Sequence, residues 1–264
     1  MKVRKQKMYQ IDAFSDSVFG GNPAAVCILK DQLDDDLMQH IAAENNLAET
    51  AFVVQKKSNY EIRWFTPTTE VALCGHATLA SAHVLFNYFE HASDTISFYS
   101  PHSGNLSVTK NKDLLTLDFP TDRITKVNPV EEILEGFDKN PLEMYKGKTD
   151  YLLLYATQDD IEQCNPNLHL LKKSNARGII ITAPGKDVDF VSRFFAPGSG
   201  VDEDPVTGSA HTTLTPFWSE KLGKTKLTAQ QLSQRKGELS CELAGERVKI
   251  AGKAVTYLIG EIYI

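Results

Sequence analysis

The sequence contains few cysteines and no long apolar run. The four cysteines lie far apart, and no C-x-x-C pair suggests a zinc site or a dithiol redox site. The longest unbroken apolar runs, Ala24–Leu29 and Tyr151–Ala156, are six residues long. A helix that crosses a membrane needs about 20 such residues. We therefore expect neither a disulfide-rich scaffold nor a membrane-spanning helix.

Long basic blocks and nucleotide-binding motifs are also absent. The net charge is −6, which makes nucleic acid and anionic membranes poor candidates as partners. Neither G-x-G-x-x-G nor G-x-x-x-x-G-K-[ST] occurs, so we expect no nucleotide cofactor. The first ten residues are basic, but Tyr9, Gln10 and Asp12 interrupt the apolar stretch that a secretory signal requires. These features predict a cytoplasmic protein.

The remaining composition is that of a globular protein with many short strands. Apolar residues make up 42% of the chain and charged residues 23%. Segments rich in Val, Ile, Tyr and Phe alternate with Gly, Pro, Asp or Asn, which is typical of strands and turns. Asp34–Asn45 is predicted to be an amphipathic helix that begins with acidic residues. In Ala77–Phe89 the apolar residues fall on nearly every side, which predicts a buried helix. This pattern predicts an α+β fold with a central helix inside a curved sheet.

An internal repeat divides the chain into two halves. Arg63–Pro67 matches Arg193–Pro197, and Cys74–Ala77 matches Thr207–Ala210 in the same order and at nearly the same spacing. Each copy is predicted to contain a strand, a Pro turn, an acidic loop and a helix of small residues. We therefore expect two half-domains, residues 1–120 and 121–264, with the last strand as a candidate to pack on the N-terminal half.

The two repeated helix starts form a candidate binding site. The helices begin at Gly75 and Gly208, so both expose backbone N–H groups that can hold a carboxylate. Cys74 and His76 flank the first glycine. The second glycine lies among polar residues, namely Asp202, Glu203, Asp204, Thr207 and Ser209.

Each of these residues also has a purely structural interpretation. The two glycines can simply turn the chain, and Cys74 can be a small buried residue. Asp204 can be a solvated turn acid, and Ser209 can be a helix-start hydroxyl. His76 lacks ligands at the usual spacing, so no metal site is expected.

Several motifs, in order and spacing over nearly the whole chain, resemble the phenazine-biosynthesis PhzF-like family. The motif residues are Asp12–Phe14, Gly21–Pro23, Asn46–Thr50, Phe65–Pro67, Cys74–His76 and Glu203–Ala210. The resemblance implies a diaminopimelate-epimerase-like fold, in which two pseudo-symmetric halves each wrap a curved, mostly antiparallel sheet around a central helix. The site of such proteins lies in the cleft between the halves, and the resemblance also suggests a homodimer.

The resemblance further implies roles for individual residues. Glu49 takes the position of the proton-transferring base, and His76 and Asp204 are the other catalytic residues of the pocket. Gly75 and Ser209 match positions at the helix starts that hold the substrate. Cys74, Thr207 and Gly208 lie beside them as substrate-binding residues.

The cysteine pattern separates two kinds of chemistry. Related epimerases use one cysteine before each helix, whereas here the positions hold Cys74 and Thr207, and a threonine hydroxyl is a far weaker base than a thiolate. We therefore expect a cofactor-independent isomerase in which Glu49 moves a proton on a small, conjugated carboxylate. The alternatives are an epimerase or racemase that uses Cys74 with another acid such as Asp204, and a non-catalytic protein that binds a carboxylate or a partner.

Pro216 argues against the second half being a close copy of the first. Pro216 falls about two turns into the second repeated helix, where it removes a hydrogen bond, so we expect the helix to kink or end there.

Overall fold

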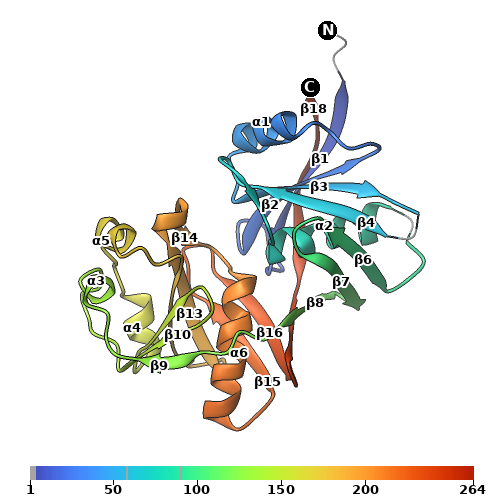
Figure 1. Ribbon diagram of the computed structural model, residues 1–264. Coiled ribbons are helices and arrows are strands. Elements are labelled where there is room, and N and C mark those ends of the chain that lie inside the picture. The colour runs from blue at the N-terminus through green and yellow to red at the C-terminus, as the bar shows by residue number, and fades with distance from the viewer. Residues whose placement is uncertain (1–3, 58, 90) are drawn as a thin grey trace. The chain divides into compact units, whose positions relative to one another are not determined.

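A computed structural model describes residues 4–57, 59–89 and 91–264 (Figure 1). The chain forms two units. The first contains Met1–Asp118 together with Ala251–Ile264, and the second contains Phe119–Ile250. The polypeptide passes between the units within two strands, β8 (Leu114–Pro120) and β17 (Arg247–Gly252). Both units combine a mixed sheet with a few helices, so the predicted α+β class is confirmed.

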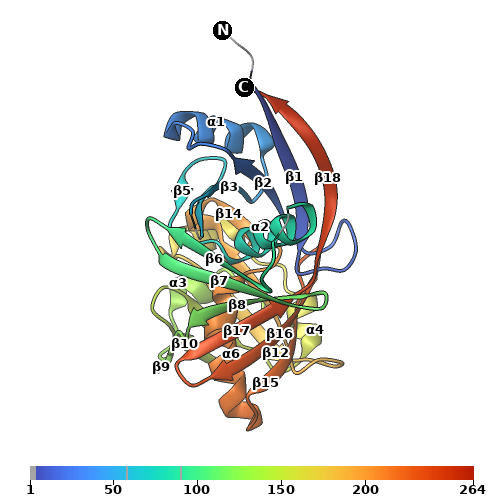
Figure 2. The ribbon, with the colours of Figure 1, turned by 90° about the vertical axis from the view of Figure 1, so that its right-hand side faces the viewer.

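The first unit is built on strands of the N-terminal part and on the last strand of the chain. Its strands are β1 (Lys5–Ala13), β2 (Asn22–Leu29), β3 (Glu49–Gln55), β4 (Tyr60–Phe65), β5 (Glu70–Val71), β6 (Thr95–Ser100), β7 (Gly104–Asn111) and β18 (Ala254–Tyr263). Its helices are α1 (Asp35–Asn45) and α2 (Gly75–Tyr88). Figure 2 shows β18 running beside β1.

The strand order of the first unit places the starts of β2 and β3 side by side. β1 lies between β18 and β2 and is antiparallel to both. β2 and β3 are parallel, which requires the crossover that α1 provides. β4 follows antiparallel to β3 and pairs at its two ends with β5 and with the parallel β6.

Helix α2 is the buried central helix of this unit. It packs against β1, β2, β3 and β18, and most of its residues are buried. Small residues such as Ala77 and Ala80 let the strands approach closely. The hydroxyls of Thr78 and Ser81 donate hydrogen bonds to the carbonyls four residues earlier, at 2.6 and 2.7 Å. The polar side chains therefore have partners inside an apolar environment, and the predicted buried helix is confirmed.

The second unit repeats this order of elements. Its strands are β9 (Thr125–Val127), β10 (Glu143–Lys146), β11 (Tyr151–Leu154), β12 (Ile179–Pro184), β13 (Phe190–Ala196), β14 (Val201–Asp204), β15 (Lys226–Gln231) and β16 (Gly237–Ala244). Its helices are α3 (Glu131–Leu134), α4 (Gln158–Glu162), α5 (Leu168–Lys173), the short 3₁₀ helix η1 (Pro197–Ser199) and α6 (Gly208–Leu222). The parallel pair β11–β12 corresponds to β2–β3, and the parallel pair β13–β15 corresponds to β4–β6.

The two copies also share a side-chain clamp. Arg63 on β4 forms two hydrogen bonds of 2.7 Å with Glu70 on β5. Arg193 on β13 forms the same bidentate pair with Glu203 on β14, at 2.7 and 2.9 Å. The two arginines occupy equivalent positions of the repeat found in the sequence, and so do the two glutamates. Each clamp fixes the short strand that precedes a central helix.

Helix α6 continues through Pro216, so the expectation that it ends there is wrong. A proline in a helix leaves the carbonyl four residues earlier without its usual donor. Here that carbonyl belongs to Thr212, and it accepts a hydrogen bond of 3.1 Å from the backbone N–H of Asp122. Asp122 also accepts a hydrogen bond from the Thr213 hydroxyl at 3.0 Å. The proline therefore creates an attachment point for the chain that enters the second unit.

Candidate active site

Glu49 lies at the first position of β3, directly after the turn that follows α1. Asn46 closes α1 in the left-handed conformation, with φ of 47°, and its N–H bonds to the carbonyl of Ala42. Such a C-cap reverses the chain within a few residues. Strand β3 therefore begins at Glu49, opposite Ala24 of β2.

Cys74 and His76 come from the start of α2. Cys74 is the N-cap residue, and no side chain caps the helix there. The first helical hydrogen bond runs from the Thr78 N–H to the Cys74 carbonyl at 3.2 Å. The N–H groups of Gly75 and His76 therefore precede the first helical bond and point out of the helix end. A helix start of this kind favours a negatively charged group beside it.

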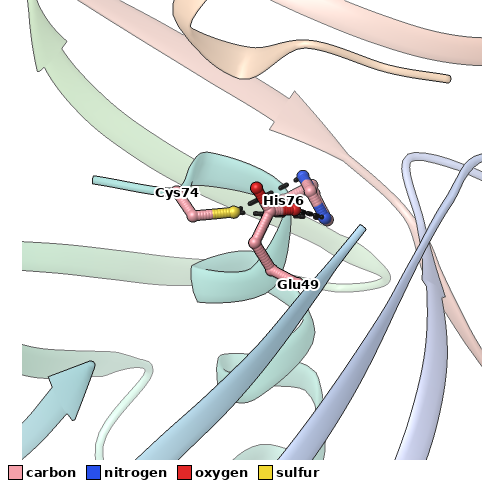
Figure 3. A group of neighbouring side chains, drawn as sticks. All are labelled: Glu49, Cys74 and His76. Carbon is pink, nitrogen blue, oxygen red and sulfur yellow. Dashed lines mark hydrogen bonds and ion pairs between the residues drawn. The ribbon is translucent and has the colours of Figure 1, made fainter. Parts of the chain in front are cut away.

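The side chains of Glu49, Cys74 and His76 point toward one another (Figure 3). His76 Nε2 lies 3.1 Å from Glu49 Oε2. Cys74 Sγ lies 3.5 Å from His76 Nδ1 and 4.0 Å from Nε2. The side chain of His76 is 5% exposed and that of Glu49 is 16% exposed. Three reactive groups thus meet in a place that is largely shielded from water within the first unit.

Asn22 is a member of this group that our sequence analysis did not single out. Its amide Nδ2 lies 3.1 Å from His76 Nδ1, on the ring nitrogen that does not face Glu49. Gly21 before it has φ of +62°, and a Cβ there would lie 2.1 Å from the carbonyl oxygen of Ala13. Only glycine fits this close approach. The Gly21–Pro23 motif therefore delivers Asn22 to the imidazole.

The site keeps the thiol neutral and favours a charged imidazole. Burial and the charge of Glu49 raise the pKa of Cys74 to about 11. Burial alone would lower the pKa of His76, but the negative charges that Cys74 and Glu49 carry when ionised raise it well above its usual value. Because the thiol is uncharged at neutral pH, Glu49 is the negative partner of His76 there. The pair is a carboxylate and an imidazole that favours its protonated form.

The remaining predicted residues, Asp204, Thr207, Gly208 and Ser209, gather at the start of α6 in the second unit. The Thr207 hydroxyl donates to Asp204 Oδ2 at 2.6 Å. The same hydroxyl accepts a hydrogen bond from Gln231 Nε2 at 3.1 Å, and Gln231 Oε1 accepts one from the Thr207 N–H at 2.8 Å. Gln231 is fully buried, and our sequence analysis missed it because it follows no motif. Thr207 is thus engaged by its neighbours, whereas Ser209 is exposed in this unit.

The acid–imidazole pair occurs in only one of the two copies. The sequence repeat places Thr207 at the position of Cys74 and Ser209 at that of His76. In the β3–β4 ladder Thr50 faces Phe65, and in the β12–β13 ladder Ile179 faces Phe195. Gly178 therefore corresponds to Glu49. The second copy offers a glycine, a threonine and a serine where the first has a carboxylate, a thiol and an imidazole.

The cluster in the first unit also contains side chains that commonly bind metal ions. The ligand atoms of Glu49, Cys74 and His76 all lie within 4.8 Å of one another, so the group has the composition of a metal site. Our sequence analysis did not expect it, because Glu49 lies far from the other two in the chain.

Among the described helices, none is long and apolar enough to cross a membrane.

Comparison with solved structures defines the fold class. A crystal structure of a phenazine biosynthesis PhzF family protein from Enterococcus faecalis superposes with a TM-score of 0.96 at 43% identity, covering 99% of this chain and 100% of that one. A hydroxyproline epimerase from Agrobacterium vitis gives a TM-score of 0.64 at 10% identity, covering 100% of this chain and 92% of that one. At that identity the likeness concerns the fold. The molecule therefore has the architecture shared by PhzF proteins and epimerases.

The chain belongs to the phenazine biosynthesis-like protein family, PhzC-PhzF, whose sequence profile matches residues 11–260. A Pseudomonas aeruginosa protein named as an uncharacterized isomerase is 50% identical over 257 residues, which cover 97% of this chain and 98% of that protein. The family resemblance found in the sequence is thereby confirmed.

Proposed function

We propose that this protein is a cofactor-independent isomerase that shifts a proton on a small, conjugated carboxylate. The observation that carries the proposal is the pairing of Glu49 with His76 in the first unit, together with its absence from the equivalent positions of the second. A racemase with two bases needs a proton-transferring group on each face of the reacting carbon. A single pair suits a reaction in which one group removes and returns the proton.

Glu49 is the proposed base. Its Oε2 atom is buried and accepts no hydrogen bond from the described residues, so its polar contact is the ion pair with His76. His76 would orient the carboxylate and hold positive charge beside it. Positioned acid–base catalysis contributes about 10²- to 10⁴-fold, or about 3–5.5 kcal/mol. That is small for an unactivated C–H bond, so the substrate proton must already be acidified by conjugation.

The environment of Cys74 argues against a thiolate mechanism. With its pKa raised to about 11, the thiol stays protonated near neutral pH. Reactive cysteines have a lowered pKa and lie in electropositive surroundings, whereas at Cys74 burial and the charge of Glu49 outweigh the imidazole 3.5 Å away, which acts to lower the pKa. This favours the carboxylate route over the cysteine-assisted epimerase that the sequence left open.

The helix starts are the proposed carboxylate-binding elements. The N–H groups at Gly75 are available because α2 has no side-chain cap. We assign Asp204, Thr207, Gly208 and Ser209 to substrate binding on the basis of the family motif, with Asp204 also as a second acid. A homodimer and a cytoplasmic location remain predictions from the sequence.

The experiment is a screen for solvent exchange. Conjugated carboxylic acids are incubated in D₂O with the wild-type protein and with Glu49→Gln, and carbon-bound deuterium is measured by NMR. The proposal expects a compound that the wild type labels and Glu49→Gln labels about 10²- to 10⁴-fold more slowly. The exposed Glu44, on α1, provides the matched control Glu44→Gln, which should retain the wild-type rate. Equal labelling by Glu49→Gln would refute the assignment, and a carboxylate that binds without exchange would favour a non-catalytic binding protein.

A further inference from the structure

Glu49, Cys74 and His76 bring three different metal ligands to one place. A carboxylate oxygen, a thiol sulfur and an imidazole nitrogen come from the start of β3, the N-cap of α2 and its first turn (Figure 3). Their ligand atoms all lie within 4.8 Å of one another. No other such group occurs among the residues that the structure describes.

The distance between the carboxylate and the imidazole is close to that of a tetrahedral zinc site. Zn–S bonds of about 2.3 Å and Zn–N and Zn–O bonds of about 2.0–2.2 Å place sulfur about 3.5 Å and oxygen about 3.3 Å from the same nitrogen. Here His76 Nε2 lies 3.1 Å from Glu49 Oε2 and 4.0 Å from Cys74 Sγ. The sulfur lies closer to Nδ1, at 3.5 Å, so the Cys74 side chain must rotate to bring it to the Nε2 side of the ring before one ion can contact all three atoms.

The donor set selects the kind of metal. Mg²⁺ and Ca²⁺ prefer oxygen ligands, whereas sulfur with imidazole and carboxylate suits Zn²⁺ and its neighbours. Three protein ligands leave a fourth position for water or a bound carboxylate. Asn22 supplies the outer contact that orients a metal-bound imidazole, because its amide lies 3.1 Å from Nδ1. A metal bound at Nε2 leaves the imidazole proton on Nδ1. Rotating the Asn22 amide presents its oxygen as the acceptor for that proton.

We propose that Glu49, Cys74 and His76 form a binding site for a thiophilic divalent cation of the Zn²⁺ class. On binding, the Cys74 thiol and Nε2 of the His76 imidazolium each release a proton to solvent. The sulfur then binds the metal as thiolate, and the Glu49 carboxylate and the neutral imidazole supply the other two bonds. The metal then occupies both members of the proposed proton-transfer pair. The site itself goes beyond the proposed isomerase activity, because metal binding needs only these three side chains.

Cobalt provides a direct readout of the sulfur ligand. Metal-free protein is titrated with Co²⁺ and the visible and near-ultraviolet absorption is recorded, since a thiolate–cobalt bond produces its own charge-transfer band. We expect one Co²⁺ per chain with this band, and displacement of Co²⁺ by Zn²⁺. Cys74→Ser should lose the band and bind roughly 100-fold more weakly or worse. Cys164→Ser, which removes another thiol of similar burial in the second unit, should keep both.

A band that is missing from the wild type, kept in Cys74→Ser or lost in Cys164→Ser would overturn the proposal. A second measurement on the wild type guards against a variant that fails to fold. In protein with ¹⁵N-labelled histidine, one equivalent of Zn²⁺ should shift the ring nitrogens of His76 and leave those of His83 and His211 in place. Unchanged His76 signals would refute the site. Neither readout depends on turnover, so failure of the metal site and failure of the isomerase proposal are distinguishable.

Discussion

His76 Nε2 lies 3.1 Å from Glu49 Oε2, and this contact joins the start of a central helix to the start of a neighbouring strand. It exists because the parallel strands β2 and β3 begin at the same end of the sheet and α2 starts against them. The relationship predicts how each partner responds when the other is changed.

Replacing Glu49 by Gln should lower the pKa of His76. Burial opposes the charged form of the imidazole, whereas the Glu49 carboxylate favours it. Without the carboxylate, the effect of burial is no longer offset by this charge. The measurement is a ¹⁵N NMR titration of the ring in both proteins. Cys74→Ser should leave the His76 titration close to that of the wild type, because the thiol is uncharged near neutral pH. A His76 pKa that ignores Glu49→Gln but follows Cys74→Ser would reverse this interpretation.

Asn22 should act as a positioning residue for the imidazole. Asn22→Asp places a second carboxylate at Nδ1 and should raise the His76 pKa further, whereas Asn22→Leu removes the partner of that nitrogen. Exchange activity should fall in both variants, and the pH profile should move in Asn22→Asp. Identical pH profiles for the wild type and Asn22→Asp, in a folded protein, would leave Asn22 with a packing role only.

The Arg63–Glu70 clamp should stabilise the strand that leads into α2. Arg63→Met breaks three charge-assisted hydrogen bonds, two to Glu70 and one of 2.6 Å to Asp35, and the free energy of unfolding should fall by about 1–3 kcal/mol. The pair Lys56–Glu61 provides the control because its lysine is exposed, and Lys56→Met should change stability by less than about 0.5 kcal/mol. Denaturant unfolding measures both. Equal losses for the two variants would show that the clamp has no special role.

His211 should make the protein sensitive to acid. It is fully buried and its Nδ1 lies 2.8 Å from the Thr207 carbonyl; burial lowers its pKa to about 4. The unfolded chain, with an ordinary pKa near 6.5, binds more protons between pH 6.5 and 4, so stability is lost as the pH falls through that window. His211→Gln should remove about 2 kcal/mol of the loss between pH 7 and 5. Urea unfolding at both pH values tests this, and an unchanged pH dependence in the variant would contradict it.

Much of the architecture could be predicted from local sequence patterns. The all-round apolar character of Ala77–Phe89 predicted the buried helix, and the two repeated motifs, in the same order in each copy, predicted two related halves. The expectation that α6 ends at Pro216 was wrong because the sequence predicts the lost hydrogen bond but not the Asp122 N–H that replaces it. Such a partner comes from a distant segment and has no local signal.

The sequence pointed to the members of the Glu49, Cys74 and His76 cluster but not to their contacts. The family motifs pointed to Glu49, Cys74 and His76 together, yet only the strand order brings the carboxylate to the imidazole. Asn22 stood in a quoted motif without a role, and Gln231 stood in none. Gly178 can be recognised as the counterpart of Glu49 only when the strand pairings of the two units are compared.

The rate at which solvent deuterium enters a turned-over substrate tests the central claim most directly when Glu49→Gln and Cys74→Ser are compared side by side. If the carboxylate transfers the proton, Glu49→Gln slows labelling by about 10²- to 10⁴-fold while Cys74→Ser stays within roughly tenfold of the wild type. The opposite order, with labelling abolished by Cys74→Ser and retained by Glu49→Gln, would contradict the account and assign the chemistry to the thiol.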